Sequence, residues 1–268
     1  MKRILGILIA LIISTKAFAS VTVMPTRVEF NANKTRANYL STSIDIKGDE
    51  RQVMRFKVYP GFFKISEKNE MVQLEGQTAP NDLSKKIKYV PSEFTVQPGK
   101  SQKLRVNVIG INSLPDGESR CVLYIEDVNP KEVALDTRMQ GIGAQLIVKT
   151  RVGVPIYVDK GKVEKNCEIQ NFSIKEEKNG LYLNAKLVNS GNSRIRYNTQ
   201  VQVLNDKKLV KEIPLKSGTV GDNNYFNIKD KLDTKDIPPG EYTLRYIVSF
   251  TDGNGKKQNV KQETQIQI

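Results

Sequence analysis

The strongest constraint on the fold of this chain is a long period-two alternation of side-chain types at positions 140–157. Successive side chains of an extended strand point to opposite sides, so alternate residues of this stretch share one face. Strands in small antiparallel domains commonly contain about 5–6 residues. The alternation therefore predicts a single strand, over 141–157, that projects past its neighbours or lies along an open sheet edge. Open edges pair readily with other strands, and most proteins shield them.

The same alternation occurs in a series of segments that are rich in β-branched and aromatic residues. In the first part of the chain these segments are 21–30, 38–46, 52–59, 86–96, 102–109, 120–128 and 141–157. Turn residues such as Pro98-Gly99 separate them. Seven strands in about 135 residues, without a helical period, predict an immunoglobulin-like β-sandwich. The polar stretch 64–84 is predicted to be a long loop or a short added element.

A second series of strands follows a short, charged segment that contains Gly161. That segment, 159–165, is predicted to be a linker between domains. Further strands are predicted at 168–174, 181–188, 195–204, 209–215, 225–228, 242–250 and 257–268. The predicted fold class is all-β, with two tandem immunoglobulin-like β-sandwich domains at 20–158 and 166–268.

The first 19 residues have the three-part pattern of a secretory signal peptide. Lys2 and Arg3 precede an apolar run at 4–13, and Ala17-Phe18-Ala19 matches a cleavage site. The apolar run is too short to span a bilayer comfortably, and no later segment reaches that length. The sequence therefore predicts a cleaved signal peptide at 1–19 and an exported protein without stable membrane insertion.

Charge and composition argue against several classes of function. Without the predicted signal peptide the 42 basic residues fall to 39, against 29 acidic residues, which leaves a net charge of +10. The basic residues are scattered through strand patterns, without an arginine-rich tract or a basic helix, so no nucleic acid is expected as a partner. The absence of histidine removes Ser-His-Asp and Cys-His catalysis and the commonest metal ligand. No motif indicates an enzyme, a cofactor or a metal site.

Two cysteines, Cys121 and Cys167, fall in different predicted domains. An even number of cysteines in an exported protein makes a disulfide possible. Bridging requires Cα atoms within about 7 Å of one another. We therefore favour two unpaired and largely buried thiols, and the disulfide stays as the alternative.

Two further segments can be interpreted once the sandwich architecture is predicted. The first predicted strand, 21–30, is interrupted by Pro25 and carries Arg27 before an apolar-acidic-apolar stretch. The segment 114–130 begins with an acidic turn containing Glu-Ser and ends at a proline, and the long alternating strand follows it. In these features and in their order the chain resembles PapD-like periplasmic chaperones, which assemble pili by the chaperone–usher route.

The resemblance implies two domains arranged as an L with a cleft between them, and a function in the periplasm. It implies pilus or fimbrial subunits and an outer-membrane usher as partners, and no catalysis. In that family the chaperone lends its long strand to a subunit that lacks its last strand. Main-chain hydrogen bonds satisfy the open edge, and alternate apolar side chains fill the groove of the subunit. Carried over, the donor residues are Leu146 and Val148 at the centre, flanked by Ile142 and Ala144.

The family also uses a basic anchor in the cleft, which holds the carboxylate at the end of the subunit. Arg27 matches the family arginine, and a guanidinium can bind a carboxylate with two donors. The companion lysine of the family aligns with Gly153, so this part of the pattern is altered. Arg151 and Lys149 have the same strand parity as Gly153, and either could replace the lysine.

Other interpretations of the sequence remain. Judged from the residues alone, the apolar alternation at 142–148 could cover the core of the first domain, since such alternation usually indicates core. The chain could be a tandem immunoglobulin-like surface or matrix module without chaperone activity. An exported hydrolase is disfavoured because there is no histidine and no nucleophile motif. The predicted open edge also allows self-association of the free protein.

Overall fold

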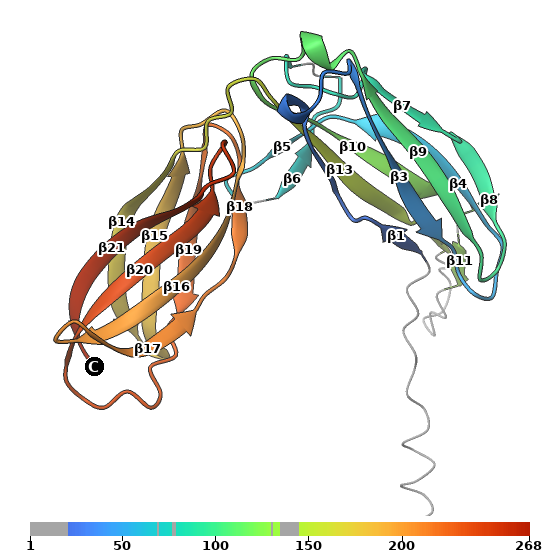
Figure 1. Ribbon diagram of the computed structural model, residues 1–268. Coiled ribbons are helices and arrows are strands. Elements are labelled where there is room, and N and C mark those ends of the chain that lie inside the picture. The colour runs from blue at the N-terminus through green and yellow to red at the C-terminus, as the bar shows by residue number, and fades with distance from the viewer. Residues whose placement is uncertain (1–20, 69, 77–78, 130, 135–144) are drawn as a thin grey trace, which may run out of the picture.

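The computed structural model describes residues 21–68, 70–76, 79–129, 131–134 and 145–268. Figure 1 shows two β-sandwiches set at an angle to one another and joined at one end. Each sandwich has its own cluster of buried apolar residues. The predicted all-β fold with two immunoglobulin-like sandwiches in an L is therefore confirmed. Among the described residues no helix is long and apolar enough to cross a membrane. The predicted signal peptide lies outside the described part.

The N-terminal sandwich consists of a four-stranded and a five-stranded sheet. The four-stranded sheet has the order β1 (Thr22–Met24), β3 (Tyr39–Lys47), β9 (Ser101–Ile109) and β7 (Ile87–Val90). The five-stranded sheet has the order β2 (Val28–Asn31), β13 (Arg151–Lys160), β10 (Gly117–Asp127), β4 (Met54–Gly61) and β8 (Glu93–Val96). Two short 3₁₀ helices, Ala32–Lys34 and Ile111–Ser113, lie in its connections. Between the sheets lie fully buried side chains such as Ile44, Ile46, Phe56, Leu104, Leu123 and Ile156.

Two predicted strands are each divided between these sheets. The strand predicted at 21–30 becomes β1, which pairs with β3, and β2, which pairs with β13. The strand predicted at 86–96 becomes β7, which pairs with β9, and β8, which pairs with β4. Pro25 and Pro91 lie at the two breaks, and a proline lacks the N–H that a continuous ladder would need. Both predictions of a single strand were wrong for this reason.

The strand predicted over 141–157 is also divided. The chain leaves strand geometry at Lys149 and Thr150, between β12 (Gln145–Val148) and β13. The partner of β13 in the sandwich, β10, ends at Asp127, whose amide donates to the carbonyl of Thr150 at 2.9 Å. Among the described residues, those of β12 therefore have no sandwich strand beside them. They pair with β11 (Lys131–Ala134) instead, in a separate two-stranded sheet.

The C-terminal sandwich begins with β14, and six residues separate it from the end of β13. One sheet contains β14 (Cys167–Glu177), β15 (Gly180–Asn189) and β19 (Asn224–Lys231). The other contains β17 (Lys208–Pro214), β16 (Ile195–Asn205), β20 (Glu241–Thr251) and β21 (Lys257–Gln267), with β18 (Gly218–Val220) also paired to β16. The sequence pattern missed β18, which is only three residues long. The core of this sandwich includes Leu183, Leu187, Val201, Leu244, Tyr246 and Val248.

The polar stretch after β4 contains a small hairpin of β5 (Phe63–Ile65) and β6 (Met71–Gln73). This hairpin belongs to the N-terminal part of the chain and lies toward the C-terminal sandwich in Figure 1. It is the short added element that the sequence analysis allowed for.

Candidate functional site

Part of β13 forms an open edge of the five-stranded sheet. On one side β13 pairs with β10 along its whole length. On the other side it pairs with β2 in parallel, and only from Ile156 to Asp159. Among the described residues no strand pairs with that side at 151–155. The backbone groups there are available to another strand, up to Pro155, which has no N–H.

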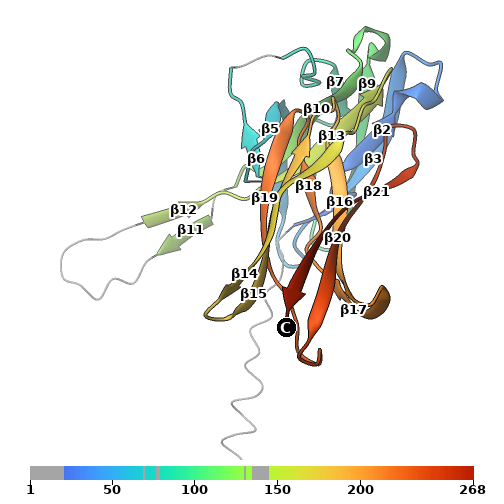
Figure 2. The same cartoon turned by 90° about the vertical axis from the view of Figure 1, so that its left-hand side faces the viewer.

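The open edge leads back along the chain to the hairpin of β11 and β12. Its register places Leu146 opposite Val133 and Val148 opposite Lys131. Figure 2 shows this hairpin extending away from both sandwiches. A two-stranded hairpin is marginally stable by itself in water, so further pairing would stabilise it. Of the predicted donor residues, Leu146 and Val148 lie in β12, whereas Ile142 and Ala144 lie outside the described residues.

The outer face of the five-stranded sheet carries a second apolar cluster, separate from the core. Its members are Phe63 from β5, Val122 and Tyr124 from β10, and Tyr157 from β13. The Phe63 ring packs edge-on against Tyr157, with 5.9 Å between the ring centroids. Arg194, which precedes β16 in the C-terminal sandwich, stacks over the ring of Tyr157, so this end of the cluster contacts the other domain.

Gly153 lies beside this apolar cluster, next to the ring of Tyr124. A Cβ atom added to Gly153 would lie 3.0 Å from Cγ2 of Val122 and 3.3 Å from Cε1 of Tyr124. The guanidinium of Arg151 stacks on the Tyr124 ring, 4.3 Å from its centroid, and donates to the Tyr59 hydroxyl at 3.3 Å. The glycine therefore makes room for Tyr124, and Tyr124 in turn positions Arg151.

Introducing a lysine at position 153 is expected to disturb the packing around Tyr124. Gly153→Lys should displace the Tyr124 ring and lower the free energy of unfolding by about 1–2 kcal/mol. This is the net change, because replacing a glycine within a strand by itself stabilises the strand. Urea unfolding measures this change, and Gly153→Ala separates the effect of the Cβ from that of the longer chain. A lysine variant as stable as the parent would show that the packing around Gly153 is looser than its contacts indicate.

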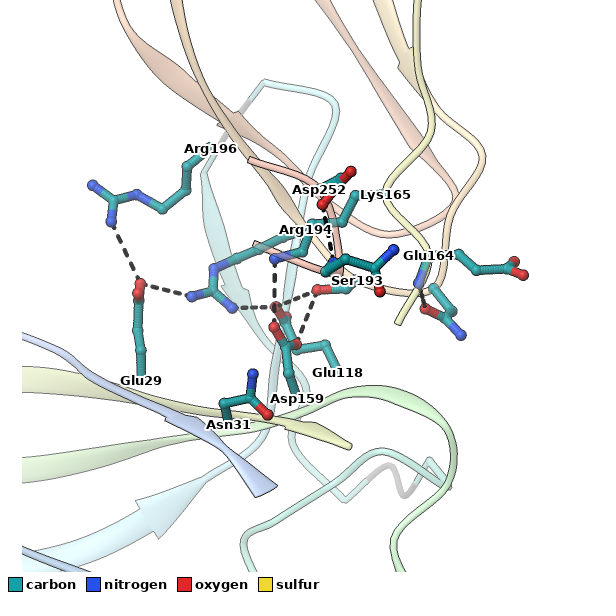
Figure 3. Close-up of polar contacts among 12 residues, drawn as sticks. Glu29, Asn31, Glu118, Asp159, Glu164, Lys165, Ser193, Arg194, Arg196 and Asp252 are labelled. Carbon is teal, nitrogen blue, oxygen red and sulfur yellow. Dashed lines mark hydrogen bonds and ion pairs between the residues drawn. The ribbon is translucent and has the colours of Figure 1, made fainter. Parts of the chain in front are cut away.

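At the joint between the sandwiches, charged side chains meet in a buried network, drawn in Figure 3. Glu118, at the start of β10, has a side chain that is 0% exposed. It accepts from Arg194, which precedes β16, and from Arg120 at 3.3 Å. Arg194 also donates to Glu29 of β2 at 2.7 Å and stacks over the Tyr157 ring at 3.3 Å. One arginine of the C-terminal sandwich thus bridges two strands of the N-terminal one.

The protonation of these groups follows from burial and from their neighbours. Burial raises the pKa of Glu118, and the charges of Arg194 and Arg120 offset only part of that increase. Burial alone would also raise the pKa of Glu29, but Arg194 and the other arginines beside it hold that pKa below its usual value. Burial tends to lower the pKa of Arg194, whereas the two glutamates raise it above its usual value. Glu29 is therefore an ionised carboxylate at neutral pH.

Further polar contacts brace the joint on both sides. Ser193 donates to Oδ1 of Asp159 at 3.0 Å, and Lys165 lies 3.4 Å from the other oxygen of the same carboxylate. On the side of the β5–β6 hairpin, Asn224 donates to the carbonyl of Ile65 at 2.7 Å. Tyr225 donates to Glu67 at 2.6 Å, and Arg120 pairs with Asp222. These contacts fix the angle between the two sandwiches at separate points.

The predicted anchor residues are not brought together. Arg27 is exposed beside the start of β2, where its Nε lies 3.3 Å from Glu29. The pairing of β2 with β13 begins one residue after Arg27, at Val28 opposite Ile156, whereas Arg151 lies at the other end of β13, five residues before Ile156. Lys149 lies between β12 and β13, outside any strand, so the parity argument does not apply to it. Within the described residues Arg27 pairs with Glu29 and Arg151 with Tyr59 and Tyr124, so the two guanidinium groups lie in different contacts.

The network around Arg194 was not predicted from the sequence. One signal was present, because Glu118 and Arg120 directly precede the apolar centre of β10 at 121–125. Charged residues at such positions need partners when the sheet face is covered. The partners could not be identified from sequence, since Arg194 lies 76 residues after Glu118.

Cys121 and Cys167 are free thiols, as favoured from the sequence. Cys121 is fully buried in the core of the N-terminal sandwich, and burial raises its pKa. Cys167 is partly buried at the start of β14, and burial raises its pKa to about 11. Neither thiol is therefore activated as a nucleophile.

Comparison with known proteins finds no matching family model and no matching curated protein. Solved structures match over most of the chain. The CupB2 chaperone of Pseudomonas aeruginosa is 13% identical, with 90% of this chain and 98% of that chain covered and a TM-score of 0.45. The class 5 fimbriae chaperone CfaA is 15% identical, with 91% and 98% covered and a TM-score of 0.49. The E. coli chaperone DraB is 16% identical, with 91% and 98% covered and a TM-score of 0.43. The chain is thus similar to solved chaperones.

Proposed function

We propose that this protein is a periplasmic chaperone that lends a strand to an incomplete pilus or fimbrial subunit. The observation that carries the proposal is the open edge of β13 at 151–155, which continues along the chain into the projecting β11–β12 hairpin. A subunit that lacks one strand offers the matching open edge. Pairing the two edges satisfies backbone groups on both chains.

The apolar side chains of the donated strand provide its contacts with the subunit. In this proposal Leu146 and Val148 enter the groove of the subunit, and Ile142 and Ala144 continue the row toward its other end. The break at Lys149 and Thr150 separates this row from β13. When a subunit binds, β12 must therefore either separate from β11 or pair with the subunit through its other edge. The free energy comes from burial of the apolar row and from completed main-chain pairing, and no cofactor is needed.

Arg27 is the proposed contact for the carboxylate at the end of the subunit. It is half-exposed, it lies 3.3 Å from Glu29, which Arg194 of the other sandwich also contacts, and its guanidinium geometry suits a carboxylate. Arg151 and Lys149 lie at the beginning of the open edge, and we propose that they flank the bound subunit strand. Delivery of the subunit to an outer-membrane usher, after export directed by residues 1–19, completes the proposed role.

Hydrogen exchange tests this function directly. Co-expression with a candidate subunit should give a complex in which the amides of β12 and of 151–155 exchange at least tenfold more slowly than in the free protein. The amides of β16 and β20, in the centre of the C-terminal sandwich, serve as the internal reference and should not change. A stable complex with unchanged exchange at β12 and β13 would contradict strand donation and favour binding through side-chain surfaces.

A further inference from the structure

The carboxylate of Glu29 lies among three arginines. Its Oε1 atom is 2.7 Å from Arg194, 3.3 Å from Arg27 and 3.5 Å from Arg196. Figure 3 shows Glu29 between the guanidinium groups of Arg194 and Arg196. Arg27 belongs to the N-terminal sandwich, whereas Arg194 and Arg196 belong to the C-terminal one. One carboxylate oxygen therefore gathers cations from both domains.

The three arginines differ in how firmly they are held. Arg194 is 9% exposed, donates to Glu29 and to Glu118, and stacks on Tyr157. The side chains of Arg27 and Arg196 are 46% and 49% exposed, and each approaches Glu29 through a single nitrogen. Arg194 is thus part of the joint, whereas the other two retain donors that face solvent.

A cavity of about 280 Å³ opens beside this group, lined in part by Glu29, Tyr157, Arg194 and Arg196. The other charged groups on its wall are Asp159 and Lys165, which pair with each other. Glu118 is already matched by Arg194 and Arg120. The remaining balance is positive, because two half-exposed arginines share one carboxylate. Such an environment can bind a second anion, or can bind an external anion in place of the Glu29 carboxylate.

We propose that Arg27 and Arg196 form an anion clamp with one arm from each sandwich, and that Glu29 is an internal carboxylate that occupies the clamp until a client carboxylate replaces it. The inference rests on the proposed function for the identity of the client, a protein chain that ends in a free carboxylate. Arg196 supplies the second cation that Gly153 cannot supply. Since the arms come from different domains, an occupied clamp also ties the two sandwiches together.

The internal carboxylate would make the clamp selective. A client carboxylate must displace Glu29 from two exposed arginines, so weakly binding anions are excluded while a chain end held nearby by strand pairing succeeds. Removing the Glu29 charge should therefore strengthen the binding of a small free carboxylate. A Glu29 that served only to hold Arg194 would give no such gain.

Nuclear magnetic resonance titration of the arginine Nε–H signals with sodium acetate, at constant ionic strength, tests the clamp without a client. The Glu29→Gln variant should bind acetate about tenfold more tightly than the parent, as read from the signals of Arg27 and Arg196. Adding Arg196→Gln should remove this gain. Equal acetate affinity in parent and Glu29→Gln, or a gain that persists without Arg196, would overturn the proposal.

Controls separate the clamp from folding and from strand donation. Glu93→Gln removes a similarly exposed carboxylate, which pairs with Arg55 at 3.1 Å, and should leave the signals of Arg27 and Arg196 unchanged. Arg120 pairs with Glu118 and Asp222, so an unchanged Arg120 signal in Glu29→Gln shows that the joint is intact. Glu29→Asp keeps the charge on a shorter side chain and serves as a second variant. Because no subunit takes part, the clamp can fail while strand donation holds, and the reverse.

Discussion

Leu146→Glu is expected to abolish co-purification with a pilus subunit while the protein remains folded. The residue lies in β12, whose backbone pairs with β11 in a separate two-stranded sheet, so the strand pairing of both sandwiches is unaffected. In a complex, however, the glutamate would enter an apolar groove, where an unpaired carboxylate is strongly disfavoured. We expect binding to weaken at least a hundredfold, because burying one unpaired charge costs several kcal/mol. Co-expression followed by affinity purification measures the loss.

Ile147→Glu is the matched control for this experiment. It introduces the same charge into the same strand, one residue further on, where the side chain points to the opposite face. We expect this variant to retain most of the complex. Equal loss of the subunit with both variants would show that β12 acts through its general apolar character, and retention with both would refute strand donation by this segment.

Arg194→Ala should strongly destabilise the protein. It leaves the Glu118 carboxylate, which is 0% exposed, without its bridging partner and removes the cation that covers Tyr157. Breaking a buried pair by removing one member costs about 3–5 kcal/mol. Urea unfolding, followed separately for each sandwich, measures the change. Small-angle scattering should show a wider range of angles between the domains.

Arg196→Ala is the comparison for this effect, since Arg196 lies two residues away but is half-exposed. Its loss should cost no more than about 1 kcal/mol, as for other exposed ion pairs. The double variant Glu118→Gln with Arg194→Ala should lose less than the two single changes together, because no charge is then left buried alone. Strict additivity would mean that the two residues stabilise the joint independently.

The sequence predicted the strands well because alternation and turn chemistry are local signals. The breaks were harder to predict. Pro25 and Pro91 lie inside segments that otherwise have strand patterns, and the alternation runs past Thr150. At each break, the strand that lies alongside changes, which periodicity does not reveal. A strand ends where its neighbour ends, and the end of β10 at Asp127 cannot be related to Thr150 from periodicity alone.

The candidate site was less predictable than the fold. Arg27 was identified through a resemblance to known chaperones, but its nearest charged partner, Glu29, was read only as part of an apolar-acidic-apolar stretch. Arg194 and Arg196 come from the other domain, and nothing in the sequence links them to β2. The sequence showed that Gly153 stands where the family has a lysine. The reason for the glycine, the nearby ring of Tyr124, lies on a different strand and could not be identified from the sequence.

The buried joint also limits how such proteins can be recombined. Glu118 and Arg120 come from one sandwich, and Arg194 and Asp222 come from the other. A chimera that joined this N-terminal sandwich to a C-terminal sandwich without counterparts of Arg194 and Asp222 would bury Glu118 and Arg120 without these partners. Exchange of whole domains should therefore fail unless these four residues are transferred as a set, even when each sandwich would retain its own core.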